Sequence, residues 1–327
     1  MNKIENYYNL DFLKIIFTII ILLYHFIRKM GFWCEGAYAI DLFFIISGFL
    51  CIVTFNKTLT VIDFIKKRYY SFVPFLIWGI LTLLFFKEFS IEKILNNIIL
   101  TPVWNYDLFV SVAWYLNVLF WLSLCLFYLN KIMKKEYITW IVSLSVFISM
   151  SLMIAHDQWL VWPKIGFLNG GWFLGIMGMG VGYLFSLIPQ QHNNQSSYRY
   201  LLYTVLEAFF LCYTVGCMFI KSWYISPYFI FISSCILFFL FLQKKGGISQ
   251  LTDIPFFMKL RKFILPTYLL QQVPIELFYI LLNKNRSLFM SYPYLTIIVT
   301  TIAIIGWGVC SYYIIKFAKF LFFKMQR

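Results

Sequence analysis

The largely apolar stretch over residues 9–29 carries Asp11, Lys14, Thr18 and His25 at positions where a lipid environment would favour aliphatic side chains. In a helix that turns about 100° per residue, Lys14 and His25 lie about 20° apart around the axis and roughly 16 Å apart along it. Asp11 and Thr18 fall in the same sector of about 100°, whereas isoleucine, leucine and phenylalanine fill the rest. Because a histidine ionises near neutral pH and suits general-base catalysis, this stripe could carry proton-transfer chemistry.

The polar stripe is costly if it lies in a membrane. A charged group near the bilayer centre costs about 2.5–3.5 kcal/mol, so such residues usually face the protein interior and mark a functional path. The alternative is that Asp11 and Lys14 extend to the nearby membrane interface. His25 is too short to do so, and we expect the stripe to line an interior path. The other histidines, His156 and His192, fall in expected loops, where a solvated side chain is the simpler interpretation.

Asp41 is a candidate partner for His25 from the second apolar run, residues 37–55. If the first two runs form adjacent helices of opposite direction, Asp41 and His25 lie at matching depth. A carboxylate there could orient the imidazole and stabilise its protonated form, as the acid of a triad does. An equally good interpretation is that Asp41 only caps its helix or lies in a contact between helices. Ser47 and Gly48, further along the run, would allow two helices to approach closely.

The composition indicates a membrane protein. Of the 327 residues, 62% are hydrophobic and 12% are charged, whereas soluble domains carry about 25% charged residues. We therefore expect a single all-α domain over residues 1–327, with about ten transmembrane helices of about 20 residues each. The apolar runs that predict them are 10–28, 37–55, 72–89, 109–130, 137–155, 169–188, 200–220, 224–242, 263–283 and 294–316.

The charge distribution predicts an orientation rather than a nucleic-acid partner. The net charge is +14, and more than twice as many lysines and arginines fall in one set of connecting segments as in the other. The positive-inside rule then places both termini in the cytoplasm. The seven cysteines show no CxxC or Cys/His spacing, so we expect neither a disulfide nor a metal site.

Two connecting segments are expected to lie in the membrane interface as amphipathic helices. Residues 57–71 combine apolar side chains with the basic cluster Lys66, Lys67 and Arg68. Residues 88–107 carry isoleucines and leucines at helical spacing. The basic cluster could also hold phosphate groups, although the chain has no glycine-rich phosphate-binding loop of the P-loop type.

With these residues in view, the chain resembles acyltransferase family 3, integral-membrane enzymes that O-acetylate bacterial polysaccharides and related glycans. The family's first helix has a basic residue, ten residues and then a histidine. Lys14 and His25 match this motif, with lysine in a position more often held by arginine. The stretch DLFFIISGF at 41–49 is similar to its second-helix block. Further similar blocks are FIKKRYYSFVPF at 64–75, AWYLNVLF at 113–120, NGGWFLGIMGMGVGY at 169–183 and LPTYLLQQVPI at 265–275.

The chain departs from the family pattern at three places. Ser71 stands where a second arginine is common, Leu119 where many members carry a glutamate, and Gln271 or Gln272 where many have a histidine. These departures are typical of a branch with a different acceptor.

The resemblance implies an O-acetyltransferase of the bacterial plasma membrane. Such an enzyme moves an acyl group, acetyl above all, from cytoplasmic acyl-CoA to a hydroxyl of a cell-surface glycan or lipid-linked saccharide. Acyl-CoA is then a substrate, and no permanently bound cofactor is expected. His25 would be the general base, with Lys14 and Asp41 as its catalytic partners. The expected substrate-binding residues are Asp11, Thr18, Ser47, Lys67, Arg68 and Trp114.

Two other classes of function fit part of the pattern. A transporter or flippase of lipid-linked glycans would also have about ten spans, but with charges scattered over several helices. A membrane scaffold would need no polar stripe at all. The concentration of polar residues in the first run favours the enzyme.

Overall fold

The computed structural model describes residues 7–55, 58–101, 108–156, 164–165, 168–189, 196–220, 227–284, 289 and 291–325. Helices make up nearly all of this part of the chain, as the apolar periodicity predicts. The described strands are β1 (Lys164–Ile165) and β2 (Leu168–Asn169), which pair antiparallel just before α7. The all-α membrane class is confirmed.

The described helices follow one another along the chain, and two of them are 3-10 helices, η1 and η2. Their bounds are α1 (Tyr8–Lys29), η1 (Gly36–Tyr38), α2 (Ala39–Val53), α3 (Val61–Leu83), α4 (Ile91–Ile98), η2 (Ser111–Ala113), α5 (Trp114–Ile132), α6 (Lys135–Ala155), α7 (Gly170–Phe185), α8 (Ser197–Phe219), α9 (Pro227–Gln243), α10 (Gly247–Leu251), α11 (Pro255–Leu270), α12 (Gln272–Lys284) and α14 (Pro293–Met325).

Every apolar run expected to span the membrane overlaps a helix or a helix pair, but the count of about ten spans is not confirmed. Within the described residues, six helical segments are long and apolar enough to cross, and α11 with α12 would make a seventh despite a 50° bend between them. The α7 and α9 helices have only 16 and 17 residues. Both are shorter than the roughly 20 residues that a span needs, so the count of about ten spans stays a prediction.

Most of the predicted interfacial segment 57–71 and the first part of the run 72–89 form one continuous helix, α3. Thr60 and Asp63 begin it with a reciprocal capping box, and Pro74 lies inside it. The outer segment 88–107 contains the short helix α4, which exposes Ile91, Leu95 and Ile99. An apolar face of this kind suits a helix lying in the membrane interface.

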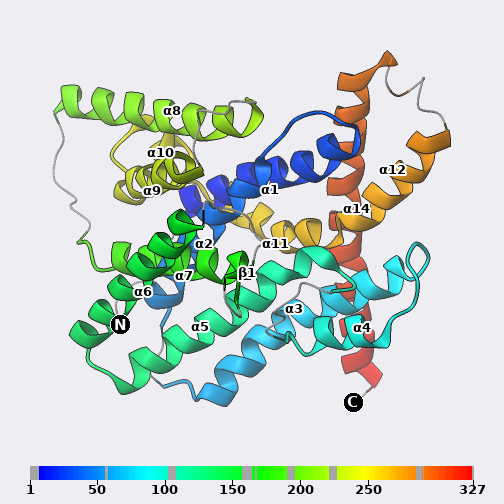
Figure 1. Cartoon of the computed structure of the whole chain (residues 1–327), viewed down its shortest axis with the longest axis horizontal. Coiled ribbons are helices and arrows are strands. Elements are labelled where there is room, and N and C mark those ends of the chain that lie inside the picture. Colours follow the sequence, from blue (N-terminus) through cyan, green and yellow to red (C-terminus); the bar gives the residue numbers. More distant parts are fainter. Residues whose placement is uncertain are drawn as a thin grey trace.

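Figure 1 shows α1 crossing the middle of the molecule, with α14 along one edge and α8 over α9 and α10 on the other side. The start of α1 is fixed by Asp253, whose Oδ1 accepts a hydrogen bond from the backbone N–H of Tyr8 at 3.0 Å. The Oδ2 atom of the same carboxylate pairs with Lys244 at 2.8 Å. A carboxylate at a helix N-terminus satisfies otherwise unpaired N–H groups and the helix dipole.

Glu207 on α8 is a fully buried carboxylate, and no sequence motif singles it out. Its two oxygens accept hydrogen bonds from the backbone N–H groups of Gly246, Ile248 and Ser249 at 3.0–3.2 Å. These donors belong to the start of α10. Glu207 therefore joins α8 to α10, and its role is structural.

The α2 and α7 helices are in backbone contact, and glycines make this possible. A Cβ atom built on Gly182 would lie 2.0 Å from the carbonyl oxygen of Ile45, and one on Gly48 would lie 2.1 Å from that of Met179. Small residues at such a crossing allow two helices to approach closely in a membrane. The glycine-rich segment of α7 thus sets the position of α2, which carries Asp41 and Ser47.

We expect Gly182→Ala to destabilise the protein, because the added methyl group forces α2 and α7 apart. Overpacking of a filled core costs about 1–3 kcal/mol. The matched control is Gly216→Ala on α8, where a Cβ meets no atom within 4 Å and alanine favours the helix by roughly 0.5–1 kcal/mol. Thermal unfolding in detergent should show a lower midpoint for Gly182→Ala alone. Equal midpoints for the two variants would contradict the proposed backbone contact.

Candidate functional site

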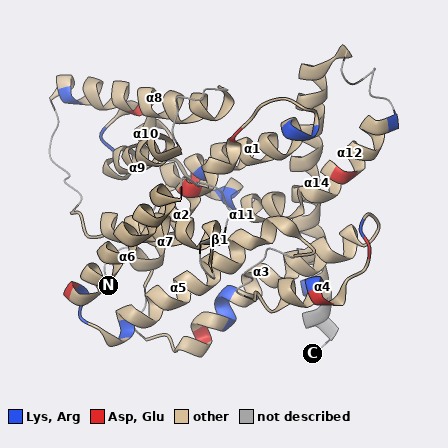
Figure 2. Cartoon of the chain, in the orientation of Figure 1, with Lys and Arg blue, Asp and Glu red and all other residues tan. Residues whose placement is uncertain are grey.

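The site is built on the buried carboxylate of Asp11, whose side chain is 3% exposed. Its Oδ1 pairs with Lys14 Nζ at 3.2 Å, one turn further along α1. Its Oδ2 lies 3.5 Å from a guanidinium nitrogen of Arg261 on α11. One carboxylate thus holds two cations from two helices far apart in the sequence. Figure 2 shows most charged residues at helix ends and in loops, with a small group at the centre near α1 and α11.

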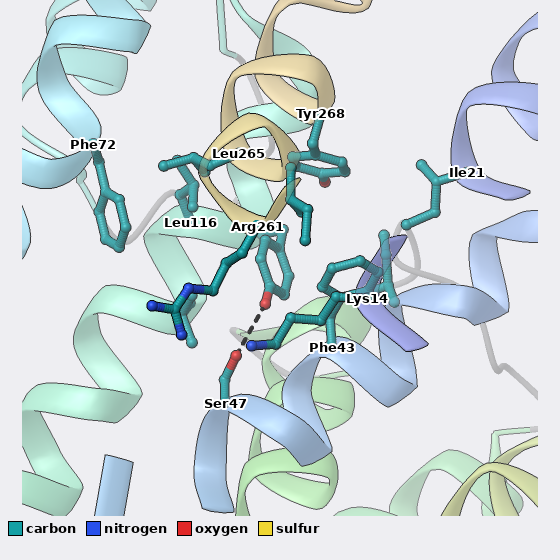
Figure 3. Close-up of a pocket in the computed structure, with 13 residues that line it drawn as sticks. Lys14, Ile21, Phe43, Ser47, Phe72, Leu116, Arg261, Leu265 and Tyr268 are labelled. Atoms are coloured by element: carbon teal, nitrogen blue, oxygen red, sulfur yellow. Dashed lines mark hydrogen bonds between the residues drawn. The ribbon is translucent and has the colours of Figure 1, made fainter. Parts of the chain in front are cut away.

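Lys14 and Arg261 both line a cavity of about 200 Å³. Figure 3 shows the two cationic side chains directed into the same space, beside Ser47 of α2. The remaining wall is mostly aliphatic and aromatic, and it comes from α1, α2, α3, α5 and α11. Its residues are Ile21, Ile40, Phe43, Phe72, Tyr115, Leu116, Leu119, Ile264, Leu265 and Tyr268.

A pair of hydroxyl groups forms the polar floor of the cavity. Ser47 Oγ and Tyr115 Oη lie 3.3 Å apart. The hydroxyl of Tyr268 donates to the backbone carbonyl of Val112 at 2.9 Å, so this ring is held in place from η2. The cavity therefore has two cations at one end, hydroxyl groups beside them and apolar walls beyond.

The basic cluster of α3 is divided between two faces of the helix. Arg68 is half-buried, and its guanidinium group lies close enough to the side chains of Cys51 and Tyr115 to interact with them electrostatically. It therefore adds a third cation near the cavity. Lys66 and Lys67 are exposed and do not line the cavity. The expectation that all three hold phosphate groups stays a prediction.

His25 lies at the opposite end of α1 from the Asp11 cluster. The cavity reaches Ile21, one helical turn of about 5.4 Å before His25. The half-buried imidazole contacts the ring of Tyr24 at 4.8 Å between centroids. The hydroxyl of Tyr24 accepts a hydrogen bond from Arg28 at 3.2 Å. In the neighbouring loop, burial raises the pKa of the Glu35 carboxyl, although the nearby Arg28 opposes this shift.

Asp41 is buried in α2, 1% exposed. The carboxylate of Asp41 lies close enough to Tyr38 and to Cys235 of α9 to interact with both electrostatically. The groups that act on His25 from its own helix are the ring of Tyr24 and the charges of Arg28 and Lys29. The expected pairing of His25 with Asp41 stays a prediction.

The other candidates differ in their relation to the cavity. Thr18 is buried and bonds to the carbonyl of Lys14 in its own helix at 2.7 Å. Trp114 is buried against Phe44; neither Thr18 nor Trp114 lines the cavity. His156 is exposed at the end of α6, and His192 lies outside the described residues. No group of three or more potential metal ligands occurs in the described part of the chain.

Arg261 is a candidate site residue that no sequence motif singles out. Arg261, Leu265 and Tyr268 stand at i, i+4 and i+7, which places them on one face of α11. All three line the cavity. This spacing is visible in the sequence, but the apposition of α11 to α1 is not.

We expect Asp11→Asn to destabilise the protein, because it leaves Lys14 and Arg261 close together without their shared carboxylate. Removing one partner of a buried ion pair costs about 3–5 kcal/mol. The side chain of Arg261 is 56% exposed, so the loss should lie near or below the lower end of that range. The control is Glu136→Gln, an exposed carboxylate at the start of α6. A thermal midpoint of Asp11→Asn equal to that of the control would contradict a structural role for the cluster.

Comparison with known proteins gives one match. The family described as Acyltransferase domain matches residues 7–312, nearly the whole chain. The matched region contains the Asp11 cluster, the cavity and His25. No curated protein and no solved structure matches the chain. Because the match covers far more than half of the residues, the chain belongs to this family of acyltransferases.

Proposed function

We propose that the protein is a membrane O-acyltransferase that moves an acyl group, acetyl above all, from acyl-CoA to a hydroxyl of a cell-surface glycan or lipid-linked saccharide. The observation that carries this proposal is a cavity with paired cations at one end and a histidine just beyond the other. Family membership supports acyl transfer over the transport of lipid-linked glycans.

The phosphate groups of the donor bind at the Lys14–Arg261 end of the cavity. Asp11 carries one negative charge and so neutralises only part of the charge of these two cations. Arg261 is the more exposed of the two and can turn to a phosphate as a bidentate donor. Arg68 adds a further positive charge from α3. Charge-assisted hydrogen bonds of this kind are the strongest available to a phosphate ligand.

The length of the donor supports this placement. In acyl-CoA, about thirteen bonds separate the thioester sulfur from the phosphorus atom nearest the pantetheine arm. A peptide has three backbone bonds per residue, so the extended arm is as long as a little over four extended residues, or roughly 15 Å. Lys14 and His25 are separated by roughly 16 Å along α1. A thioester whose phosphates lie at Lys14 would therefore reach the level of His25. The arm runs past the hydroxyls of Ser47 and Tyr115, which can bind its amide groups.

His25 acts as the general base. It takes the proton from the acceptor hydroxyl while that oxygen attacks the thioester carbonyl carbon. The carbon–sulfur bond then breaks, and the departing thiolate receives the proton that His25 holds. Asp41, which is buried in α2, is the candidate that orients the imidazole and stabilises its protonated form.

The orientation follows from the charge distribution. Both termini lie in the cytoplasm of a bacterial cell, which places the Lys14 end of α1 toward the cytoplasmic pool of acyl-CoA. His25 then lies toward the outer face of the plasma membrane, where surface glycans are found. The donor enters from one side and the acceptor from the other.

We expect His25→Ala to lower acyl transfer by at least about 10²–10⁴-fold, the usual contribution of a general base. The matched control is His156→Ala, which removes an exposed histidine at the end of α6. Both proteins should insert and accumulate normally. The measurement is the O-acetyl content of the surface glycan in cells that carry each variant as their only copy.

Substitutions at Lys14 test the donor end of the same proposal. Lys14→Arg keeps the positive charge and should retain more activity than Lys14→Ala. The loss in Lys14→Ala should be recovered in part at high acetyl-CoA concentration in isolated membranes, whereas the loss in His25→Ala should not. Normal acetylation by a stably expressed His25→Ala protein would refute the mechanism.

A further inference from the structure

A second opening lies on the lipid-facing side of α3, away from the Lys14–Arg261 cavity. It is a groove between α3 and α14 with a volume of about 830 Å³. Its base includes Trp78, whose ring nitrogen donates to Ser311 at 3.1 Å and whose ring stacks on Trp307 at 6.5 Å. The residues lining it are Tyr70, Val73, Pro74, Ile77, Trp78, Leu81, Ile315, Ala318 and Lys319.

The groove has the length of one membrane leaflet. The wall that α3 contributes runs from Tyr70 to Leu81. These two residues are eleven positions apart, which corresponds to about 16 Å along a helix. The hydrocarbon core of a bilayer is about 30 Å thick, so one leaflet contributes about 15 Å. The walls are apolar apart from Lys319 and the hydroxyl of Tyr70. This length and this lining suit a hydrocarbon chain of a membrane lipid.

One end of the groove is basic. On a helical wheel the groove residues of α3 span about 140°, and Lys66 and Lys67 fall inside this sector one turn before Tyr70. Both lysines are exposed, as is Lys319 on α14. Arg68 falls about 160° from Tyr70, on the side that faces the cavity. The two lysines therefore lie on the groove side of α3, just beyond its lining residues, whereas Arg68 lies on the cavity side.

An apolar groove that ends in three lysines complements an anionic amphiphile. We infer that the groove binds an anionic phospholipid, with a hydrocarbon chain along α3 and the phosphate at Lys66, Lys67 and Lys319. The bound lipid fills the space between α3 and α14. It thereby supports the face of α3 that carries Arg68 and Phe72 toward the cavity. This site is separate from the proposed reaction, and its test needs no acyl transfer.

The test is lipid retention by the purified protein. The protein is reconstituted with equal amounts of dioleoyl phosphatidylglycerol and dioleoyl phosphatidylcholine, re-extracted in mild detergent and examined by native mass spectrometry. We expect one retained phosphatidylglycerol. Because each lysine near an anionic headgroup contributes a factor of roughly five, the variant K66Q/K67Q/K319Q should lose most of the preference, up to about 100-fold.

The matched control is K134Q/K135Q/K259Q, which removes the same charge from exposed lysines outside the groove and should keep the preference. Ala318→Trp fills the groove and should abolish retention without changing any charge. Lys319→Gln alone, expected to weaken retention about fivefold, serves if the triple variant fails to accumulate. Equal retention of both lipids by the unaltered protein, or an unchanged preference in the groove variants, would overturn the inference.

Discussion

The arrangement depends on one buried carboxylate that must neutralise two cations. Asp11 is almost inaccessible to solvent, and it lies within 3.5 Å of both Lys14 and Arg261. A charge buried without a partner is prohibitively costly, so α1 and α11 must pack where this cluster can form. Asp253 adds a second tie at the same end by capping α1. The two ties fix the cationic end of the cavity, while the exposed side of Arg261 stays free to turn to a ligand.

The other walls of the cavity are positioned by close packing rather than by charge. Glycines of α7 bring its backbone against α2, and this contact sets the depth of Ser47. The Ser47–Tyr115 hydroxyl contact then relates α2 to α5, and Tyr268 is tied to η2 through the carbonyl of Val112. Small residues, hydroxyl contacts and one ion cluster are the interactions expected where lipid supplies no hydrophobic driving force between helices. The proposed acyl transfer uses the space that these contacts leave open.

Much of this arrangement could be predicted from the sequence. Apolar runs located the helices, and the period of 3.6 residues placed Asp11, Lys14 and Thr18 on the inward face of α1, where Asp11 and Thr18 are buried. Three features could not be predicted. Arg261 joins the site only because α11 packs on α1, which is a tertiary contact. Whether Asp41 meets His25 cannot be decided from their matching depth, because helix rotation also decides which side chains meet. The number of spans depends on helix length and bending, and these are set by packing.

We propose that one cavity holds the donor, with its phosphates at Lys14 and Arg261 and its acyl group toward His25. A structure of the protein with an acetyl-CoA analogue would test this placement, if the sulfur is replaced by a methylene group so that the acetyl group cannot be transferred. We expect phosphate oxygens within about 4 Å of Lys14 or Arg261, the usual ion-pair limit, and the acetyl group between Ile21 and His25. Phosphates bound instead at Lys66 and Lys67, or an acetyl group far from His25, would contradict it.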